Sequence, residues 1–178
     1  GLRKQGRLDA ALECCREAVR LDPVSATARC QLLTTLAYMP FAAWRTYADE
    51  GQAAVATFAP GAITPSPAPA GKKPDAKIHI AFLVNETAML RDLAFFEAFL
   101  VHYDRKKFFV RVYQQYSRPF AETSRLQKET DDWRPVYNID DETLAFIAGN
   151  DGIDVLVDLC GASPDGRPVF LARRSAPV

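Results

Sequence analysis

Residues 153–159 read Ile-Asp-Val-Leu-Val-Asp-Leu, and Cys160-Gly161-Ala162-Ser163 follows them. The run is almost wholly apolar and rich in leucine and β-branched residues, a composition that suits a strand buried on both faces of a parallel sheet. The small residues after it predict a loop at the carboxyl end of that strand. Ligands of open α/β sheets bind just outside such ends. The stretch therefore predicts a parallel α/β domain with a candidate site beside Gly161.

The alternation of strand and helix patterns extends back to residue 77. We expect further strands at 78–84, 108–116 and 136–139, and helices at 89–103, 124–132 and 142–149. Ser124 and Gln127 have the spacing of a capping box, and Asp140 is placed to cap the last helix. Strands that alternate with helices predict a doubly wound, Rossmann-like parallel sheet with helices on both faces.

The residues before this domain are helical in pattern and end in a proline-rich stretch. We expect helices at 7–21, 26–37 and 42–58. Four prolines between residues 65 and 74 favour an extended linker rather than a packed helix. The predicted organisation is therefore a helical domain at 1–58, a linker at 59–76 and an incomplete α/β lobe at 77–178.

The first helical pattern has the spacing of a tetratricopeptide repeat. The pattern consists of Gly6, Ala11, Cys15, Ala18 and Pro23. Small residues let two antiparallel helices approach closely, Gly6 permits the turn, and Pro23 forbids continuation. The alternative is a generic helical hairpin. One repeat is too few for stability, so we expect more repeats before Gly1.

Charge and cysteine content exclude several classes of protein. Lys plus Arg and Asp plus Glu number 22 each, and a net charge of zero argues against a nucleic-acid-binding protein. No apolar run reaches membrane-spanning length, and we expect no signal peptide. The four cysteines do not have zinc-ligand spacing, so we predict reduced thiols, no metal site and a cytoplasmic location.

Two loops are candidates for ligand binding. Asn85-Glu86-Thr87 follows the first strand and leads into a helix, whose backbone N–H groups could receive an anion or a sugar hydroxyl. The alternative is that Thr87 is only the helix cap. In the second loop Gly161 allows close approach of a ligand, Ser163 offers a hydroxyl, and Arg167 offers several donors. The alternative there is a simple turn with Arg167 paired to a carboxylate.

Other polar residues have a structural interpretation. The two histidines, His79 and His102, have no partners at metal-ligand spacing, so we expect structural roles for both. The acidic pairs at 131–132 and 140–141 are expected on solvated faces or in caps. No GxGxxG motif, P-loop or Ser-His-Asp set is present, so the sequence gives no support for a dinucleotide site.

The order of these pieces resembles a known family. The resemblance rests on Gly6–Pro23, Ile78–Val84, Phe95-Phe96-Glu97, Leu100-Val101-His102-Tyr103-Asp104-Arg105 and Asp151–Val178. Together they resemble the bacterial SPINDLY-type, O-linked N-acetylglucosamine transferase-like proteins of glycosyltransferase family 41. The family implies a GT-B architecture, in which two Rossmann-like lobes enclose the active cleft.

The resemblance also implies an activity. Such enzymes transfer N-acetylglucosamine from UDP-N-acetylglucosamine to Ser or Thr hydroxyls of proteins, usually without metal or other cofactors, and some relatives use GDP-fucose or modify Asn. Tetratricopeptide repeats present the acceptor polypeptide, and the second lobe holds most of the donor nucleotide. The chain departs from the family at two positions where a histidine is usual, because Leu90 and Ala162 stand there. Ser163 keeps the hydroxyl that follows the second of them.

We therefore interpret the chain as a fragment of a protein glycosyltransferase. Asn85, Thr87, Gly161, Ser163 and Arg167 are the candidate substrate-binding residues, and Glu86 is the nearby carboxylate that could handle a proton. We expect the isolated chain to be catalytically silent and prone to association through an open sheet edge. The alternatives are a non-catalytic tetratricopeptide scaffold, motivated by Leu90 and Ala162, and an unrelated flavodoxin-like domain that binds a small molecule.

Overall fold

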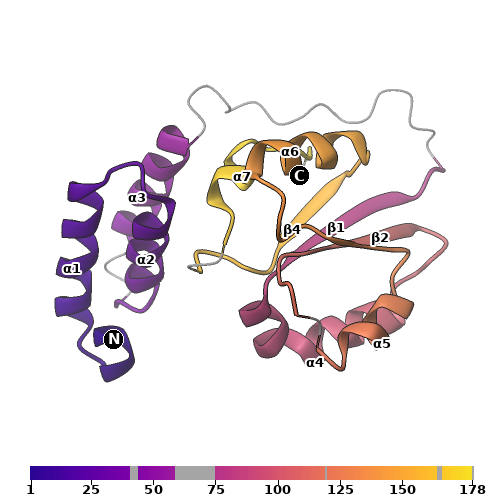
Figure 1. The fold of residues 1–178 in the computed structure, drawn as a ribbon, viewed down its shortest axis with the longest axis horizontal. Helices are drawn as coiled ribbons and strands as arrows, with labels where there is room; N and C mark the ends of the chain where they lie inside the picture. The colour runs from indigo at the N-terminus through magenta and orange to yellow at the C-terminus, as the bar shows by residue number, and fades with distance from the viewer. Residues whose placement is uncertain (41–43, 59–74, 119, 164–165, 178) are drawn as a thin grey trace. The chain divides into compact units, whose positions relative to one another are not determined.

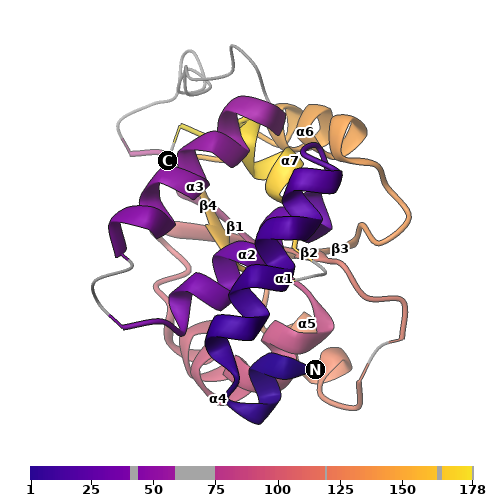
Figure 2. The same cartoon turned by 90° about the vertical axis from the view of Figure 1, so that its left-hand side faces the viewer.

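The computed structural model describes residues 1–40, 44–58, 75–118, 120–163 and 166–177. Most of the predicted linker, and the start of the helix expected at 42–58, lie outside these ranges. The chain divides into two compact units, which are drawn in Figures 1 and 2. The first contains Gly1–Ile63 and Gly161–Arg173, and the second contains Thr64–Cys160 and Arg174–Val178.

The first unit is helical. Its elements are the 3-10 helix η1 (Leu2–Gln5) and the α-helices α1 (Leu8–Leu21), α2 (Ala26–Ala37), α3 (Trp44–Phe58) and α7 (Pro168–Ala172). Gly6 ends η1 with a φ of 73°, a left-handed conformation that glycine adopts without strain. Leu12, Leu32 and Leu36 form the buried centre of the unit, and Tyr47 of α3 packs against them. The helices predicted at 7–21 and 26–37 are thus confirmed, the second at both ends.

The second unit is a parallel sheet with helices on both faces. Its elements are β1 (Ile78–Val84), α4 (Glu86–His102), β2 (Phe108–Gln114), α5 (Thr123–Lys128), β3 (Asp132–Pro135), α6 (Asp141–Asn150) and β4 (Val155–Asp158). The strand order is β3-β2-β1-β4, and every pair is parallel. Figure 1 shows α4 and α5 on one face of the sheet and α6 on the other. The predicted doubly wound sheet is confirmed.

The main core of this unit lies between the sheet and the α4–α5 layer. Alternate side chains of β1 and β2 point to this face, and Phe82, Val84, Val110 and Val112 are buried against Phe96, Leu100 and Leu126. The ring centroids of Phe82 and Phe96 are 5.2 Å apart in an edge-to-face arrangement. Period-two alternation in the strands therefore decides which residues meet the helices.

Strand β4 differs from its prediction. It is parallel to β1, as expected, but it covers only Val155–Asp158, lies at the edge of the sheet, and is partly exposed along its whole length. The prediction of a strand buried on both faces is wrong, because all four residues of β4 keep partial exposure. An edge strand leaves one side of its backbone ladder unpaired by the sheet.

Strand β3 and helix α5 also differ from their predictions. The third strand lies at Asp132–Pro135 rather than 136–139, because Asp132 pairs in register with Arg111 of β2. Helix α5 ends at Lys128, and its predicted capping box is absent, because Ser124 lies inside the helix. The hydroxyl of Thr123 accepts the Phe120 N–H instead, at 3.0 Å.

Asp140 caps α6 as predicted. Its carboxylate accepts the N–H groups of Glu142 and Thr143 at 3.1 and 2.9 Å. These bonds lower the pKa of Asp140, the backbone and side chain of Thr143 being the main cause. Within the described ranges, no helix has the length and apolar character that a membrane crossing requires.

Candidate functional site

The strand order of the second unit points to the end of its sheet where the strands have their carboxyl termini. We call this end, beside β1 and β4, the switch-point edge. The helix after β1 covers one face, and the helix before β4 covers the other, so the chain reverses direction between these two neighbouring strands. In doubly wound sheets, ligands bind beyond the carboxyl ends of the strands at this switch point. Leu83 and Asp158 stand side by side there. The residues that follow β1 and β4 are thus the candidate site of this unit.

Asn85 stands directly after β1 and begins α4. It is buried, and its side-chain oxygen accepts the Ala88 N–H at 2.7 Å. Asn85 is therefore the helix cap, and the interpretation of Thr87 as the cap is wrong, because Thr87 lies inside the first turn of α4. Strand β1 ends at Val84, and this position makes Asn85 the first residue able to cap the helix.

Glu86 and Thr87 are exposed in the first turn of α4. The amino end of a helix carries partial positive charge, so it favours a carboxylate, a phosphate or a sugar hydroxyl. With Asn85 between the strand and the helix, these two side chains lie at the switch-point edge of the sheet. Nothing else in the structure tests the roles predicted for them.

Cys160 ends the β4 side of the edge as a buried thiol. Its sulfur accepts from the Gln115 side chain at 3.1 Å and donates to the Leu83 carbonyl at 3.5 Å, and its backbone N–H donates to the Asp158 carboxylate at 2.8 Å. Burial raises the pKa of this thiol strongly, and the nearby Asp158 adds to the effect. Cys160 therefore joins neighbouring strands as a neutral group and is unsuited to nucleophilic chemistry.

Two residues of this edge were missed by sequence reasoning. Gln115 was expected inside a strand, but β2 ends at Gln114, so Gln115 lies just beyond the carboxyl end. Arg91 of α4 donates to the Leu159 carbonyl at 3.1 Å and to the Asp92 carboxylate at 2.6 Å. The bond from Arg91 lowers the pKa of Asp92. The predicted strand ran past Gln115, so its place at the strand end was hidden, and nothing in the sequence pointed to Arg91.

The other predicted substrate residues belong to the first unit. Gly161 has a φ of 58°, Ser163 is half-buried, and half-buried Arg167 stands at the start of α7. The Ser163 carbonyl accepts the Gly166 N–H at 2.9 Å. The close turn expected at Gly161 is present, and the structure does not test substrate binding by these three residues.

The two positions where the family carries histidine have different surroundings. Leu90 lies within α4 and is 66% exposed, so it is not in the loop before the helix as the resemblance implied. Ala162 belongs to the first unit, and its carbonyl oxygen accepts the Thr34 hydroxyl. Neither side chain can exchange a proton.

The two histidines lie at the ends of the first strand–helix pair. The ring of His79 packs on Phe109 with centroids 4.9 Å apart. The backbone N–H of His79 donates to the Asp154 carboxylate at 2.7 Å. His102 is the last residue of α4. Among the residues that the structure describes, no group of three or more His, Cys, Asp or Glu side chains could hold a metal ion.

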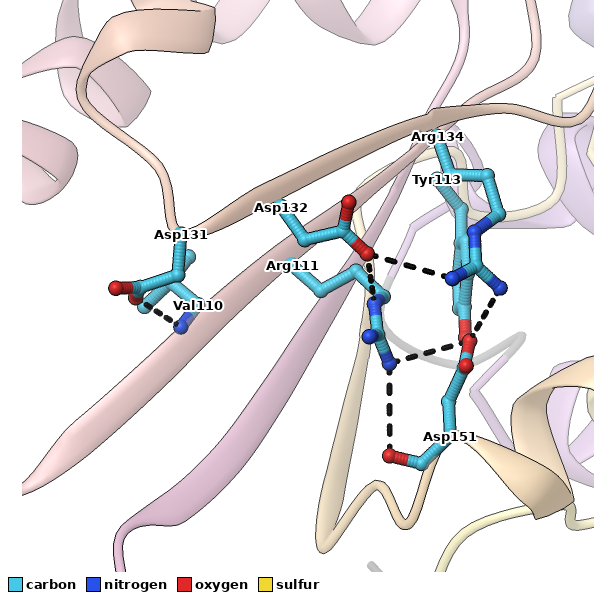
Figure 3. A network of polar contacts seen from close by, with 7 residues as sticks. All are labelled: Val110, Arg111, Tyr113, Asp131, Asp132, Arg134 and Asp151. Atoms are coloured by element: carbon cyan, nitrogen blue, oxygen red, sulfur yellow. Dashed lines mark hydrogen bonds and ion pairs between the residues drawn. The ribbon is translucent and has the colours of Figure 1, made fainter.

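A charged network occupies the sheet away from the switch point. Figure 3 shows Arg111 between the carboxylates of Asp132 and Asp151, at 2.5 and 3.1 Å, with Arg134 Nη1 2.8 Å from Asp151. The buried Tyr113 hydroxyl donates to Asp151 at 2.6 Å. Burial, followed by Asp151, raises the pKa of Tyr113. The network links β2, β3 and the end of α6.

The prediction of a solvated face for the acidic pair at 131–132 fits exposed Asp131 but misses the bonds that both carboxylates make. Asp132 belongs to this network, and Asp131 accepts the Val110 N–H at 2.8 Å and the Tyr103 hydroxyl at 2.7 Å. Both carboxylates are bound by neighbouring strands rather than simply solvated. Apart from Arg134, the groups that hold them lie 21 or more residues away in the chain, a separation that local sequence patterns do not reveal.

Native cysteine reactivity should separate Cys160 from Cys14. We expect iodoacetamide at pH 8 to modify exposed Cys14 at least about 100-fold faster than buried Cys160, which reacts only after local opening. Peptide mass spectrometry of timed samples measures both rates, and full reaction of Cys160 in urea is the control. Modification of both thiols at the same rate would contradict the conclusion that Cys160 is a buried, neutral thiol.

The raised pKa of Cys160 also predicts how the stability of the fold depends on pH. Its contribution to stability is complete below the unfolded-state thiol pKa of about 8.5 and declines as the pH rises from there toward the folded value. The free energy of unfolding, measured by urea titration, should therefore fall more between pH 7.5 and 9.5 for the wild type than for Cys160→Ser.

Comparisons with known proteins agree with this architecture. No family model matches the sequence. Over 111 residues, 60% of this chain, it is 32% identical to the probable UDP-N-acetylglucosamine–peptide N-acetylglucosaminyltransferase SPINDLY of Arabidopsis thaliana. The SPINDLY protein of Oryza sativa is 33% identical over 88 residues. These matches cover 12% and 10% of the two relatives, so the chain corresponds to a small part of each.

A solved structure matches nearly the whole chain. A mutant of the O-GlcNAc transferase from Thermobaculum terrenum superimposes with a TM-score of 0.81 and 28% identity, over 99% of this chain and 34% of that one. The fold and the relatives together define the class as glycosyltransferase-like. Within that class, the chain is similar to SPINDLY proteins and to an O-GlcNAc transferase, which confirms the resemblance to O-GlcNAc transferase-like proteins.

Proposed function

We propose that the protein to which this chain belongs transfers N-acetylglucosamine from UDP-N-acetylglucosamine to Ser or Thr hydroxyls of proteins. The observation that carries the proposal is the match of both units, over 99% of the chain, to an O-GlcNAc transferase. The names of the SPINDLY relatives specify the same donor and a peptide acceptor. The switch-point edge supplies the kind of polar, helix-terminal site that a sugar or an acceptor hydroxyl needs.

The proposed roles follow from the chemistry of each group. Thr87 and the α4 amino end hold a sugar or acceptor hydroxyl, Asn85 orders that turn, and Glu86 receives a proton from the acceptor hydroxyl. Gly161 and Ser163 contact sugar or phosphate through backbone and hydroxyl groups, and Arg167 adds a cation. The proposal needs no metal and no cofactor besides the donor substrate.

The helices α1–α3 are proposed to contribute to acceptor binding. The closely packed α1–α2 hairpin, with Gly6 at its start and Pro23 at its turn, supports its interpretation as part of a tetratricopeptide array. Such arrays offer an extended surface for a polypeptide. We propose a cytoplasmic location for the same reason as before, the reduced state expected of the four cysteines.

Leu90 and Ala162 favour a second candidate function. A histidine at either position would donate or accept a proton near neutral pH, and neither leucine nor alanine can. The second candidate is therefore a scaffold in which the helical unit binds a polypeptide and the α/β lobe does no chemistry. It differs from the first in one measurable property, the turnover of a nucleotide sugar.

Turnover is tested with the complete protein encoded by the gene that contains this chain. If the protein is a transferase, acceptor peptide should stimulate release of UDP from UDP-N-acetylglucosamine, and Glu86→Gln should lower kcat about 10²-fold or more, as loss of a general base does. Glu142→Gln makes the same carboxylate-to-carboxamide change at an exposed position on α6. It is the matched control and should leave kcat unchanged. Mass spectrometry of the peptide should show one added N-acetylhexosamine.

The outcomes separate the two candidates. Peptide binding without any UDP release by the wild type would reject the transferase and support the scaffold. If Glu86→Gln turns over at the wild-type rate, only the role of Glu86 is rejected. The transferase activity stands, because the transfer itself is still observed.

A further inference from the structure

The predicted substrate loop is structurally part of the helical unit. Gly161–Arg173 follows β4 directly in the sequence, yet it groups with the first unit, not with the sheet. This segment contains Gly161, Ser163 and Arg167, the residues proposed to contact the substrate. The contacts that hold it are therefore contacts with helices at the beginning of the chain.

One of these contacts is a hydrogen bond across 128 positions of sequence. Thr34 of α2 donates its hydroxyl to the Ala162 carbonyl, between Gly161 and Ser163. The same hydroxyl lies 2.7 Å from the Cys30 carbonyl of its own helix. A bond back to the preceding turn is usual for a helical threonine, whereas the bond to Ala162 is specific to this loop.

A second anchor is the short helix α7. It packs against α3 and α2 within the first unit, as Figure 2 shows for α3. Its Phe170 is fully buried, and Arg167 precedes its first residue. The segment is thus tied to the helices both at its start, through Ala162, and at its end.

Gly161, Ser163 and Gly166 lie close together between the two anchors. Gly166 donates its N–H to the Ser163 carbonyl at 2.9 Å, and a Cβ added at Gly166 would lie 2.5 Å from the Gly161 carbonyl oxygen. That distance is too short for any side chain, so position 166 accepts only glycine without a shift of the Gly161 backbone.

We propose that Thr34 is a positioning residue for the substrate loop, and that through it the helical unit sets the affinity of Gly161, Ser163 and Arg167 for their substrate. The inference rests on the proposed function, since it assigns that loop to substrate. It adds that α2, an element of the polypeptide-binding unit, controls the sugar- or acceptor-binding loop. A polypeptide that alters α2 changes substrate affinity by the same coupling.

The first test measures the loop itself in the 178-residue chain. Thr34→Val keeps the shape of the side chain and removes the hydroxyl, and Thr34→Ser keeps the hydroxyl. Thr57→Val on α3 is the matched control, since its hydroxyl bonds to Ala53 of its own helix at 2.8 Å. Hydrogen exchange with mass spectrometry should show exchange in peptides covering residues 161–167 about tenfold faster in Thr34→Val alone.

The second test measures substrate affinity in the complete protein. Thr34→Val should raise KM about three- to tenfold, the effect of losing one hydrogen bond, with kcat changed less than about twofold. Thr34→Ser should restore the wild-type KM, and Gly166→Ala should raise KM without touching α2. The kinetic parameter identifies the role, because general destabilisation would lower the active fraction and hence kcat.

Several results would overturn the inference. Unchanged exchange at 161–167 in Thr34→Val rejects the anchor, and an equal rise over α1–α3 shows a destabilised helical unit instead. Faster exchange with an unchanged KM rejects the link to substrate. A wild type without turnover rejects the proposed function and this link with it, while the exchange experiment still decides whether Thr34 holds the loop.

Discussion

Phe96→Ala should lower the free energy of unfolding of the second unit by about 3–5 kcal/mol, the range for removing a large buried aromatic side chain. Phe96 is 1% exposed on α4 and packs edge-to-face on Phe82 of β1. The change would leave a cavity between the helix and the middle of the sheet. Because α4 begins at the candidate site, this helix also holds Glu86 and Thr87 in place.

The adjacent residue supplies the control for this experiment. Phe95 is 68% exposed, so Phe95→Ala should change the free energy of unfolding by less than about 1 kcal/mol. Urea titration can be followed by the fluorescence of Trp133, which packs against the same core, in a Trp44→Phe background. Equal effects of the two substitutions would contradict the orientation of α4.

Asp151→Ala is expected to cost about 2–4 kcal/mol, because its loss leaves several partly buried partners without their acceptor. Asp151 accepts from the fully buried Tyr113 hydroxyl and pairs with Arg111 and Arg134. Replacing it strands a buried hydroxyl and leaves two arginines with one carboxylate. Urea denaturation monitored through Trp133 measures the change.

A double-mutant cycle tests whether the network acts as one unit. Tyr113→Phe removes the hydroxyl that Asp151 accepts, so the double variant should lose less than the sum of the two single variants. Glu142→Ala on α6 is the control for loss of an exposed carboxylate and should stay within about 0.5 kcal/mol of wild type. Additive effects of Asp151→Ala and Tyr113→Phe would contradict their direct bond.

Regular local patterns predicted most of the fold. Helix α2 begins and ends where it was predicted, and Asp140 caps α6, because the signals for helix ends lie within a few residues of the elements they govern. Strand β3 was missed because its position depends on pairing between Asp132 and Arg111, which lie on different strands. Register between strands is a tertiary property, and a four-residue strand has too little pattern of its own.

The candidate site shows the same division. The loops after β1 and β4 were identified because small and polar residues follow apolar runs, which is a local signal. The choice between Thr87 and Asn85 as the cap required the end of β1 to within one residue, and sequence patterns do not give that accuracy. The bond between Thr34 and Ala162 joins residues at opposite ends of the chain, so no local pattern could have indicated it.

The pairing around Arg111 has a consequence for how the surface attracts ligands. Two guanidinium groups, of Arg111 and Arg134, lie within 3.5 Å of two carboxylates, of Asp132 and Asp151, and their formal charges cancel. The fields of these opposite charges largely cancel, and what remains is screened beyond the Debye length of about 8 Å at physiological salt. An approaching nucleotide phosphate would therefore feel almost no pull toward this cluster, and any long-range steering of an anion must come from cations elsewhere in the protein.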